Sequence, residues 1–125
     1  MKTVLIDTDI AIDFLRGLNQ AKSLITPLWE QNAAFLSLLS VYELYAGMQE
    51  KEKTATDNFI RACQIEPLTF EISQKAGELY RFYRKEGLTL TAIDCLIFAT
   101  AKTQQHLIAT RNLRHYPDKK LLYKG

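Results

Sequence analysis

The sequence predicts an α/β fold, a three-layer α/β/α sandwich around a mainly parallel sheet of four to five strands. Short apolar segments alternate along the chain with longer segments whose apolar residues recur at helical spacing. The 125 residues contain no repeat, low-complexity tract or linker, so we expect one domain over residues 1–125. Strands separated by helices imply a sheet that is mainly parallel and covered by helices.

The expected elements follow one another closely along the chain. In order, they are a strand over Lys2–Ile6, helices over Ile10–Gly17 and Gln20–Gln31, a buried strand over Ala34–Leu39, a helix opened by Ser40, a helix over Thr54–Gln64, a strand over Ile65–Thr69 that Pro67 interrupts, a helix over Phe70–Glu86, a helix from Thr91 to about Gln104, and strands over His106–Thr110 and Lys120–Tyr123.

Local signals indicate where these helices begin and end. Asp9 is a better N-cap candidate than Asp7 for the first helix. Ser40-Val41-Tyr42-Glu43 fits a capping box, and apolar residues follow at helical spacing. Gly87 ends the long amphipathic helix that precedes it. Thr91 opens a helix that is apolar on nearly every face, which predicts burial.

Four polar residues follow the expected strands or open a helix. Asp7 follows the first strand, Glu43 follows the second, and Asn112 follows the strand that ends near residue 110, while Asp94 lies in the first turn of a buried helix. Because open parallel sheets place their sites at the carboxyl ends of strands, we expect these residues to meet at one edge.

Each acid also has a purely structural explanation. Asp94 fits a capping box with Thr91, and from pattern alone Glu43 is a cap or a solvated glutamate. Asp7 is harder to explain in this way, because Asp9 is free to cap the first helix. A further acid, Asp13, is expected to form a surface pair with Arg16.

The chemistry of these side chains favours a hard divalent cation. Carboxylate oxygens suit Mg²⁺ or Mn²⁺, and neither His106 nor His115 has a spacing typical of zinc sites. Such a cation would polarise a phosphoryl oxygen and activate water for attack on phosphorus. It would also relieve the repulsion among clustered carboxylates.

Charge and composition add weaker indications. The net charge is only +2, but residues 102–125 carry six Lys and Arg side chains against Asp118 alone. Arg81, Arg84 and Lys85 form a second basic cluster, and both clusters are open to two explanations, phosphate contacts or a solvated surface. Two cysteines without a disulfide pattern, and no apolar run long enough to span a membrane, predict a cytoplasmic protein.

Four segments together resemble the ordered motifs of PIN domains, most closely those of VapC-type toxins from bacterial toxin–antitoxin pairs. The segments are Asp7-Thr8-Asp9-Ile10, Ser40-Val41-Tyr42-Glu43-Leu44-Tyr45-Ala46-Gly47, Ala92-Ile93-Asp94-Cys95-Leu96-Ile97-Phe98-Ala99 and Ala109-Thr110-Arg111-Asn112-Leu113-Arg114-His115-Tyr116. Each motif alone is weak, whereas four in the right order over nearly the whole chain are specific.

The resemblance implies an endoribonuclease that depends on Mg²⁺ or Mn²⁺. It implies metal ligands at Asp7, Glu43 and Asp94, and it aligns the family's usual fourth acid with Asn112. An amide brings no negative charge, so this departure puts a second metal ion in doubt; Asp9 or Asp118 are the acids that could compensate. The remaining expected site residues are Thr8 and Thr110, whose hydroxyls would orient the acids, and Arg111 and Arg114, which would contact RNA.

The resemblance also implies a homodimer and a cognate antitoxin whose tail fills a groove and blocks the site. Tyr45, Met48 and a helical face around Leu79, Phe82 and Tyr83 are candidates for apolar contacts. Two rival functions stay open at this point. One is a catalytically silent module that binds RNA or antitoxin, and the other is a haloacid-dehalogenase-type phosphatase, suggested by Asp7-Thr8-Asp9 but lacking a late acidic pair.

Overall fold

The computed structural model describes residues 2–125 and contains a parallel four-stranded sheet in the order β3-β2-β1-β4. Within these residues the elements are β1 (Val4–Ile6), α1 (Thr8–Leu15), α2 (Asn19–Glu30), β2 (Ala34–Ser37), α3 (Leu38–Gly47), the 3₁₀ helix η1 (Glu50–Glu52), α4 (Lys53–Ala62), β3 (Gln64–Glu66), α5 (Phe70–Lys85), α6 (Ala92–Gln104), β4 (Leu107–Ala109) and the 3₁₀ helices η2 (Leu113–His115) and η3 (Lys119–Leu121). The predicted α/β class and parallel sheet are confirmed.

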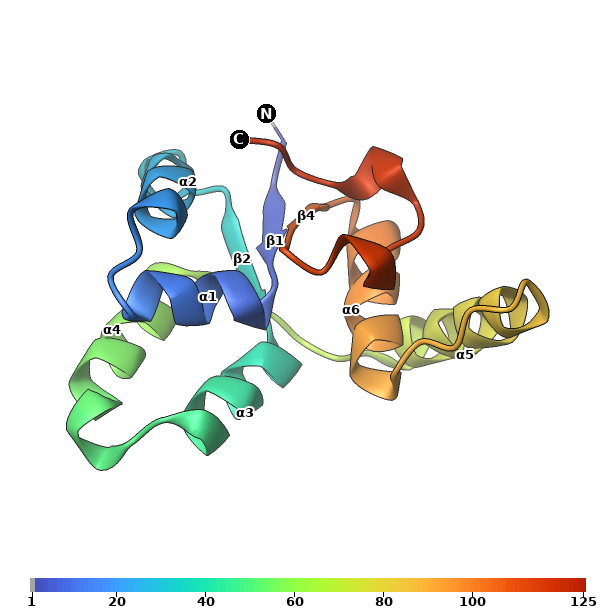
Figure 1. Cartoon of the computed structure of the whole chain (residues 1–125), viewed down its shortest axis with the longest axis horizontal. Helices are drawn as coiled ribbons and strands as arrows, with labels where there is room; N and C mark the ends of the chain where they lie inside the picture. Colours follow the sequence, from blue (N-terminus) through green and yellow to red (C-terminus); the bar gives the residue numbers. More distant parts are fainter. Residues whose placement is uncertain (1) are drawn as a thin grey trace.

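Helices cover both faces of the sheet, as Figure 1 shows: α1 to α4 lie on one side, and α5 and α6 on the other. The central strand explains these two layers, because its side chains alternate between faces. Val4 and Ile6 belong to a core cluster with α1 to α4, whereas Leu5 packs in a second cluster with α5 and α6. The chain therefore has two buried cores with the sheet between them.

Two helix starts differ from the prediction. The first helix begins at Thr8, and its N-cap is Asp7 and not Asp9, because the Asp7 side chain accepts a hydrogen bond from the Thr8 backbone. The helix expected from Ser40 begins at Leu38 with Ser37 as its N-cap, so the proposed capping box at Ser40 is wrong. The first strand ends at Ile6, as predicted, whereas the second ends at Ser37, earlier than its apolar residues suggest. In both cases the helix follows the strand more closely than predicted.

The C-terminal strand predicted over Lys120–Tyr123 is also wrong. Residues Lys119–Leu121 form a 3₁₀ helix, and only an isolated parallel bridge joins Leu122 to Ile108. By contrast, β3 ends just before Pro67, as expected of a residue that cannot donate a ladder hydrogen bond. The long helix predicted before Gly87 and the helix capped by Thr91 are confirmed.

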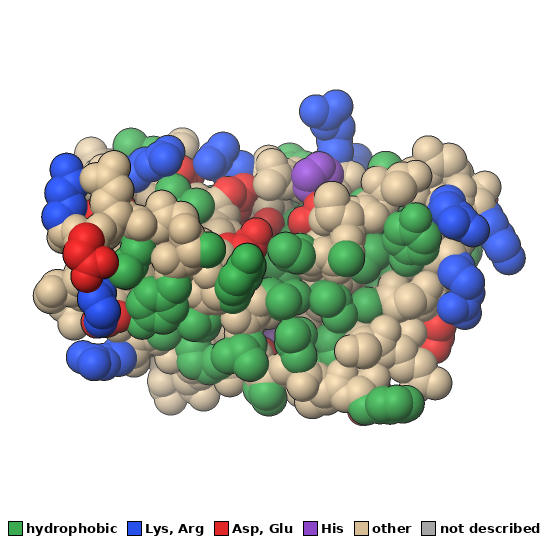
Figure 2. Space-filling model, turned by 90° about the horizontal axis from the view of Figure 1, so that it is seen from below, with side chains coloured by type: hydrophobic (Ala, Val, Ile, Leu, Met, Phe, Trp, Pro, Cys, Tyr) green, Lys and Arg blue, Asp and Glu red, His purple; other side chains and the backbone are tan. Residues whose placement is uncertain are grey.

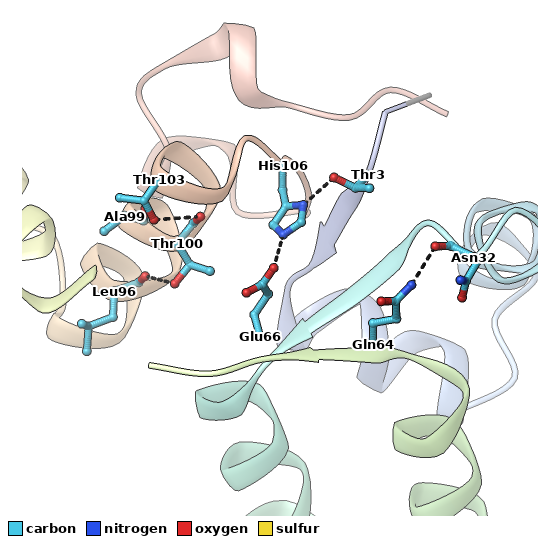
Figure 3. Close-up of polar contacts among 9 residues, drawn as sticks. All are labelled: Thr3, Asn32, Gln64, Glu66, Leu96, Ala99, Thr100, Thr103 and His106. Atoms are coloured by element: carbon cyan, nitrogen blue, oxygen red, sulfur yellow. Dashed lines mark hydrogen bonds and ion pairs between the residues drawn. The ribbon is translucent and has the colours of Figure 1, made fainter. Parts of the chain in front are cut away.

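A buried histidine ties the start of β4 to the far edge of the sheet (Figure 3). The ring nitrogens of His106 lie 2.6 Å from Oγ1 of Thr3 and 2.6 Å from Oε1 of Glu66. The ring also packs against Phe35, with centroids 4.4 Å apart. This contact joins residues next to β1, β3 and β4.

In Figure 1 strand β1 runs downward from the N-terminus, so Figure 2, seen from below, looks onto the carboxyl end of that strand. Acidic side chains lie near the middle of this surface, apolar side chains cover much of the remainder, and Lys and Arg side chains lie mainly toward its ends and rim. The carboxyl end of β1 therefore lies among a group of acidic side chains with an apolar surface around it. Among residues 2–125, every helix is too short or too polar to cross a membrane.

Candidate active site

Asp7 lies at the centre of this end of the sheet and is only 6% exposed. It follows β1 directly, and three donors hold its carboxylate. Oδ1 accepts from the Thr8 backbone N–H at 2.9 Å, and Oδ2 accepts from Oγ1 of Thr110 at 2.8 Å and from the hydroxyl of Tyr116 at 3.2 Å. The carboxylate is therefore oriented from three points, two of them on the segment that follows β4.

The electrostatics of this carboxyl group are unusual. The pKa of Asp7 is raised to about 6, because burial and, to a lesser extent, the nearby charge of Asp9 outweigh the lowering effect of the three hydrogen bonds. Loss of solvation disfavours the charged form of a carboxylate, whereas a bound cation favours it. Asp7 thus carries a charge that the fold destabilises and that a positive ligand would stabilise.

Thr8 joins Asp7 to the second predicted site residue, Glu43. The Thr8 hydroxyl donates to Oε1 of Glu43 at 2.6 Å and lies 2.9 Å from the hydroxyl of Ser40. Because α3 starts at Leu38, Glu43 lies beyond the first turn and its carboxylate contacts α1. The expected roles as a helix cap or as a fully solvated side chain are therefore wrong for Glu43. Thr8, by contrast, contacts both acids, with its backbone and its hydroxyl.

Asp94 lies on the first turn of α6, as predicted. Thr91 caps this helix, and its hydroxyl accepts from the Asp94 backbone N–H at 3.1 Å. The Asp94 carboxylate, however, contacts a different residue: its Oδ2 lies 2.8 Å from Nδ1 of His115 on η2. Its side chain is only 15% exposed.

The structure does not bring all three carboxylates into a ready-made metal cage. Over residues 2–125, no three His, Cys, Asp or Glu side chains are arranged closely enough to hold an ion. Asp7 and Glu43 are joined through Thr8, and the Asp94 charge acts on the same buried hydroxyl of Tyr116 that contacts Asp7. The three acids therefore share one region, with Asp94 paired to His115.

The donor set nevertheless fits a hard divalent cation. Every candidate ligand is a carboxylate oxygen, the class that Mg²⁺ and Mn²⁺ prefer. Mg²⁺ also keeps several water ligands, so a site with one or two direct carboxylates is typical. The raised pKa of Asp7 shows that a positive charge would be favourable next to it. The residues present are thus compatible with the expected metal.

The segment after β4 contacts most of these acids. The backbone N–H of Arg111 donates to Asp9, and its guanidinium donates to both carboxylate oxygens of Asp13, at 2.7 and 3.2 Å. The expected surface pair of Asp13 with Arg16 is therefore wrong, because Asp13 is buried and its partner is Arg111. Arg111 is exposed, but its guanidinium already pairs with Asp13.

Of the remaining predicted residues, Asn112 and Arg114 are exposed on the segment after β4, whereas Asp118 lies elsewhere. Asn112 is exposed next to the site, and its backbone N–H donates to Thr110 at 3.0 Å. Arg114 is exposed on η2. Asp118 lies elsewhere, where it caps η3 and pairs with Lys102 at 3.2 Å, so of the two acids considered as compensation only Asp9 is near Asp7.

Sequence analysis did not identify Tyr116, Ser40 or His115 as members of the site. Tyr116 belongs to the fourth motif, but an aromatic residue there is more typical of a core. The contact between Tyr116 and Asp7 joins residues that are 109 positions apart. Local periodicity carries no signal for such a pairing.

A groove of about 590 Å³ lies beside the acids, between α1, α3, η1 and α4. Its walls include apolar side chains such as Leu15, Leu44 and Met48, together with charged ones such as Arg16 and Lys51. Glu43 also lines it. A ligand in this groove would therefore contact a candidate site residue.

Comparison with known proteins places these features in context. The family model described as PIN domain matches residues 4–117. Ribonuclease VapC19 of Mycobacterium tuberculosis is 39% identical over 116 residues, which cover 90% of this chain and 91% of that protein. Ribonuclease VapC10 of the same organism is 31% identical over 114 residues, or 91% of this chain and 86% of that protein.

Solved structures show the same fold. VapBC2 from Rickettsia felis, bound to a DNA fragment from its promoter, superimposes with a TM-score of 0.83 and 17% identity, covering 98% of this chain and 97% of that one. A toxin–antitoxin complex from Klebsiella pneumoniae gives a TM-score of 0.81 at 22% identity, with the same coverage. At such low identity these likenesses concern the fold alone.

Proposed function

Since this chain belongs to the PIN-domain family, we propose that it is a Mg²⁺- or Mn²⁺-dependent endoribonuclease, the toxin of a VapC-type toxin–antitoxin pair. One observation is the main support for metal-dependent hydrolysis. The buried carboxylate of Asp7, with its raised pKa, is joined through Thr8 to Glu43 at the carboxyl end of a parallel sheet. Relatives named as ribonucleases, similar over about nine-tenths of the chain, support RNA as the substrate.

Asp7, Glu43 and Asp94 would hold the metal, and Asp94 would have to turn toward it from His115. When bound, the metal would supply Lewis-acid chemistry, polarising a phosphodiester and activating water for in-line attack on phosphorus. Thr8 and Thr110 would keep Glu43 and Asp7 in place.

Asn112 distinguishes this site from the family pattern, because an amide stands where a fourth acid is usual. We propose that Asn112 orients water or RNA without adding charge, and that Asp9 supplies the extra negative potential beside Asp7. Arg114, which is exposed on η2, is the better candidate for a phosphate contact. Arg111 is less suited, because it already pairs with Asp13.

Two surfaces suit the expected protein partners. The groove beside Glu43 would take a segment of a cognate antitoxin, which would then block the site. Leu38, Tyr42 and Phe70, which are 47%, 65% and 85% exposed, would contribute to a homodimer interface on elements that begin at this end of the molecule. Light scattering of the wild type and of Tyr42→Glu would test the dimer, which is contradicted by a monomeric wild type.

The test of the enzymatic proposal is RNA cleavage by purified protein, in Mn²⁺ and in chelator. We expect cleavage only with metal, and a loss of about 100-fold or more in Asp94→Asn, because residues that merely orient metal ligands already change activity about 10- to 100-fold. Asp57→Asn is the matched control, since Asp57 lies on α4 and pairs with Lys53.

The outcome also separates the rival functions. RNA binding that persists in chelator without any cleavage would favour the catalytically silent module. Phosphate release from a small phosphomonoester, with RNA left intact, would favour the phosphatase. Induction in bacteria followed by mapping of new RNA 5′ ends would then identify the substrate.

A further inference from the structure

Tyr116 is the largest fully buried side chain of the described residues, and its hydroxyl reaches the site. The ring packs edge-on against Phe98 of α6, with centroids 6.0 Å apart and an interplanar angle of 74°. The hydroxyl lies 3.2 Å from Oδ2 of Asp7. Phe98 is one helical turn beyond Asp94, so Tyr116 connects the helix of one candidate ligand with the side chain of another.

We propose that Tyr116 is a positioning residue of this enzyme, whose phenol hydroxyl fixes the Asp7 carboxylate so that Oδ1 is presented to the metal. This inference rests on the proposed function, since it concerns the same acidic site. Tyr116 acts through Asp7 and would not itself touch the RNA or the metal.

Counting acceptor positions supports the choice of Oδ1. An ionised carboxylate has about four lone-pair positions, two on each oxygen. Thr110 and Tyr116 both donate to Oδ2, which fills that oxygen. The Thr8 backbone fills one position on Oδ1, so one acceptor position on Oδ1 stays available. Without the phenol, Oδ2 would regain a vacant position and the carboxylate would have one restraint fewer.

The hydroxyl is placed to act as a donor. A phenol has an ordinary pKa of about 10, so it keeps its proton at neutral pH and can donate to a carboxylate. A buried hydroxyl also needs a partner, and Asp7 supplies it.

The experiment compares Tyr116→Phe with Tyr83→Phe. Both substitutions remove one phenol oxygen from a ring that packs on Phe98, since Tyr83 stacks on it with centroids 5.9 Å apart. Of these two tyrosines, only Tyr116 donates a hydrogen bond to Asp7. We expect the dissociation constant for Mn²⁺, measured by calorimetry on the intact protein, to rise about tenfold in Tyr116→Phe and to stay unchanged in Tyr83→Phe. With RNA, kcat should fall while KM stays the same.

A second pair of variants tests the same carboxylate oxygen if Tyr116→Phe does not fold. Thr110→Val removes the other donor to Oδ2 and should also weaken Mn²⁺ binding, whereas Thr110→Ser keeps the hydroxyl and should retain it. Equal Mn²⁺ affinities in the wild type, Tyr116→Phe and Thr110→Val would overturn the positioning role, and so would equal losses in Tyr116→Phe and Tyr83→Phe.

The same measurements distinguish this inference from the proposed function. A wild type that binds Mn²⁺ but cleaves no RNA would contradict the ribonuclease, while a weaker Mn²⁺ affinity in Tyr116→Phe would still support the positioning role. A wild type that cleaves RNA without binding Mn²⁺ or Mg²⁺ would overturn the role assigned to Tyr116. It would still support RNA as the substrate.

Discussion

At the scale of the residue, Asp7 combines two tasks that seemed to exclude each other. Its carboxylate caps α1, and burial also raises the pKa of this carboxyl group to about 6. The two tasks are compatible because one oxygen is enough for the cap, and because the first turn of a helix favours negative charge. The role of Asp7 as a helix cap therefore does not exclude a role in the site.

The raised pKa of Asp7 makes the stability of the metal-free protein depend on pH. The pKa rises from 3.8 to about 6 on folding, so the folded state binds the proton more tightly than the unfolded state does. This contribution to the free energy of unfolding is complete below about pH 4 and is lost as pH rises through 6, by about 3 kcal/mol in total.

Urea unfolding in chelator at pH 4 to 7 measures this effect. Relative to Asp7→Asn, the wild type should lose about 2 kcal/mol of its free energy of unfolding between pH 4 and 7, which is most of the full effect, because asparagine does not titrate. Asp57→Asn serves as the control, since hydrogen bonds from Tyr45 and Lys53 lower the pKa of Asp57. Parallel pH profiles for the wild type and Asp7→Asn would show that Asp7 is not perturbed.

At the scale of the element, side chains on the segments before and after β4 make two separate sets of long-range contacts. At the carboxyl end, the segment after β4 supplies Thr110 and Tyr116 to Asp7 and Arg111 to Asp13. Just before β4, His106 bridges Thr3 and Glu66, so it links the start of β4 to the end of β3 (Figure 3). These side-chain contacts add to the backbone pairing that joins β4 to β1.

Removal of Glu66 should therefore destabilise the fold more than removal of its neighbour Gln64. Glu66→Ala leaves Nε2 of the buried His106 without its partner, a loss of about 1–3 kcal/mol in the free energy of unfolding. Gln64 makes an exposed hydrogen bond to the Asn32 carbonyl, so Gln64→Ala should cost less than about 1 kcal/mol.

The measurement is the urea midpoint of each variant at pH 7. Similar midpoints for Glu66→Ala and Gln64→Ala would mean that the His106 contact contributes nothing beyond an exposed bond. Glu66→Gln adds a further comparison, because it keeps the shape of the side chain but not its charge.

At the scale of the whole molecule, the acids gather at one end because every strand points the same way. Elements separated by most of the chain length, β1 and β4, are hydrogen-bonded neighbours, and the residues that follow them meet. The resulting cluster of negative charge predicts that metal binding and folding are coupled.

Mg²⁺ or Mn²⁺ should therefore raise the thermal stability of the protein. At a metal concentration 100 times the dissociation constant, the gain is about 2.7 kcal/mol if only the folded state binds. Thermal unfolding with and without metal measures it. The double variant Asp7→Asn/Asp94→Asn should lose the increase, and the same metal-induced shift in that variant would refute the site assigned here.

Much of the architecture was predictable because it depends on local patterns. The amphipathic helix before Gly87 and the apolar helix capped by Thr91 both lie where periodicity and capping residues indicated. The errors at Asp7 and Ser37 arose because two capping residues follow each strand closely. Which of the two residues caps the helix depends on where the preceding strand ends. That end is set by pairing with strands that are distant in the sequence, so local patterns do not reveal it.

The sequence by itself determined the alternation of strands and helices, the parallel sheet, the place of Asp7 directly after the first strand and the place of Asp94 in the first turn of a helix. Only the tertiary structure decided that Thr8 joins Asp7 to Glu43, that Tyr116 contacts Asp7, and that His115 pairs with Asp94. The physical reason is that periodicity records which face of an element is buried, whereas these contacts arise when separate elements pack against one another.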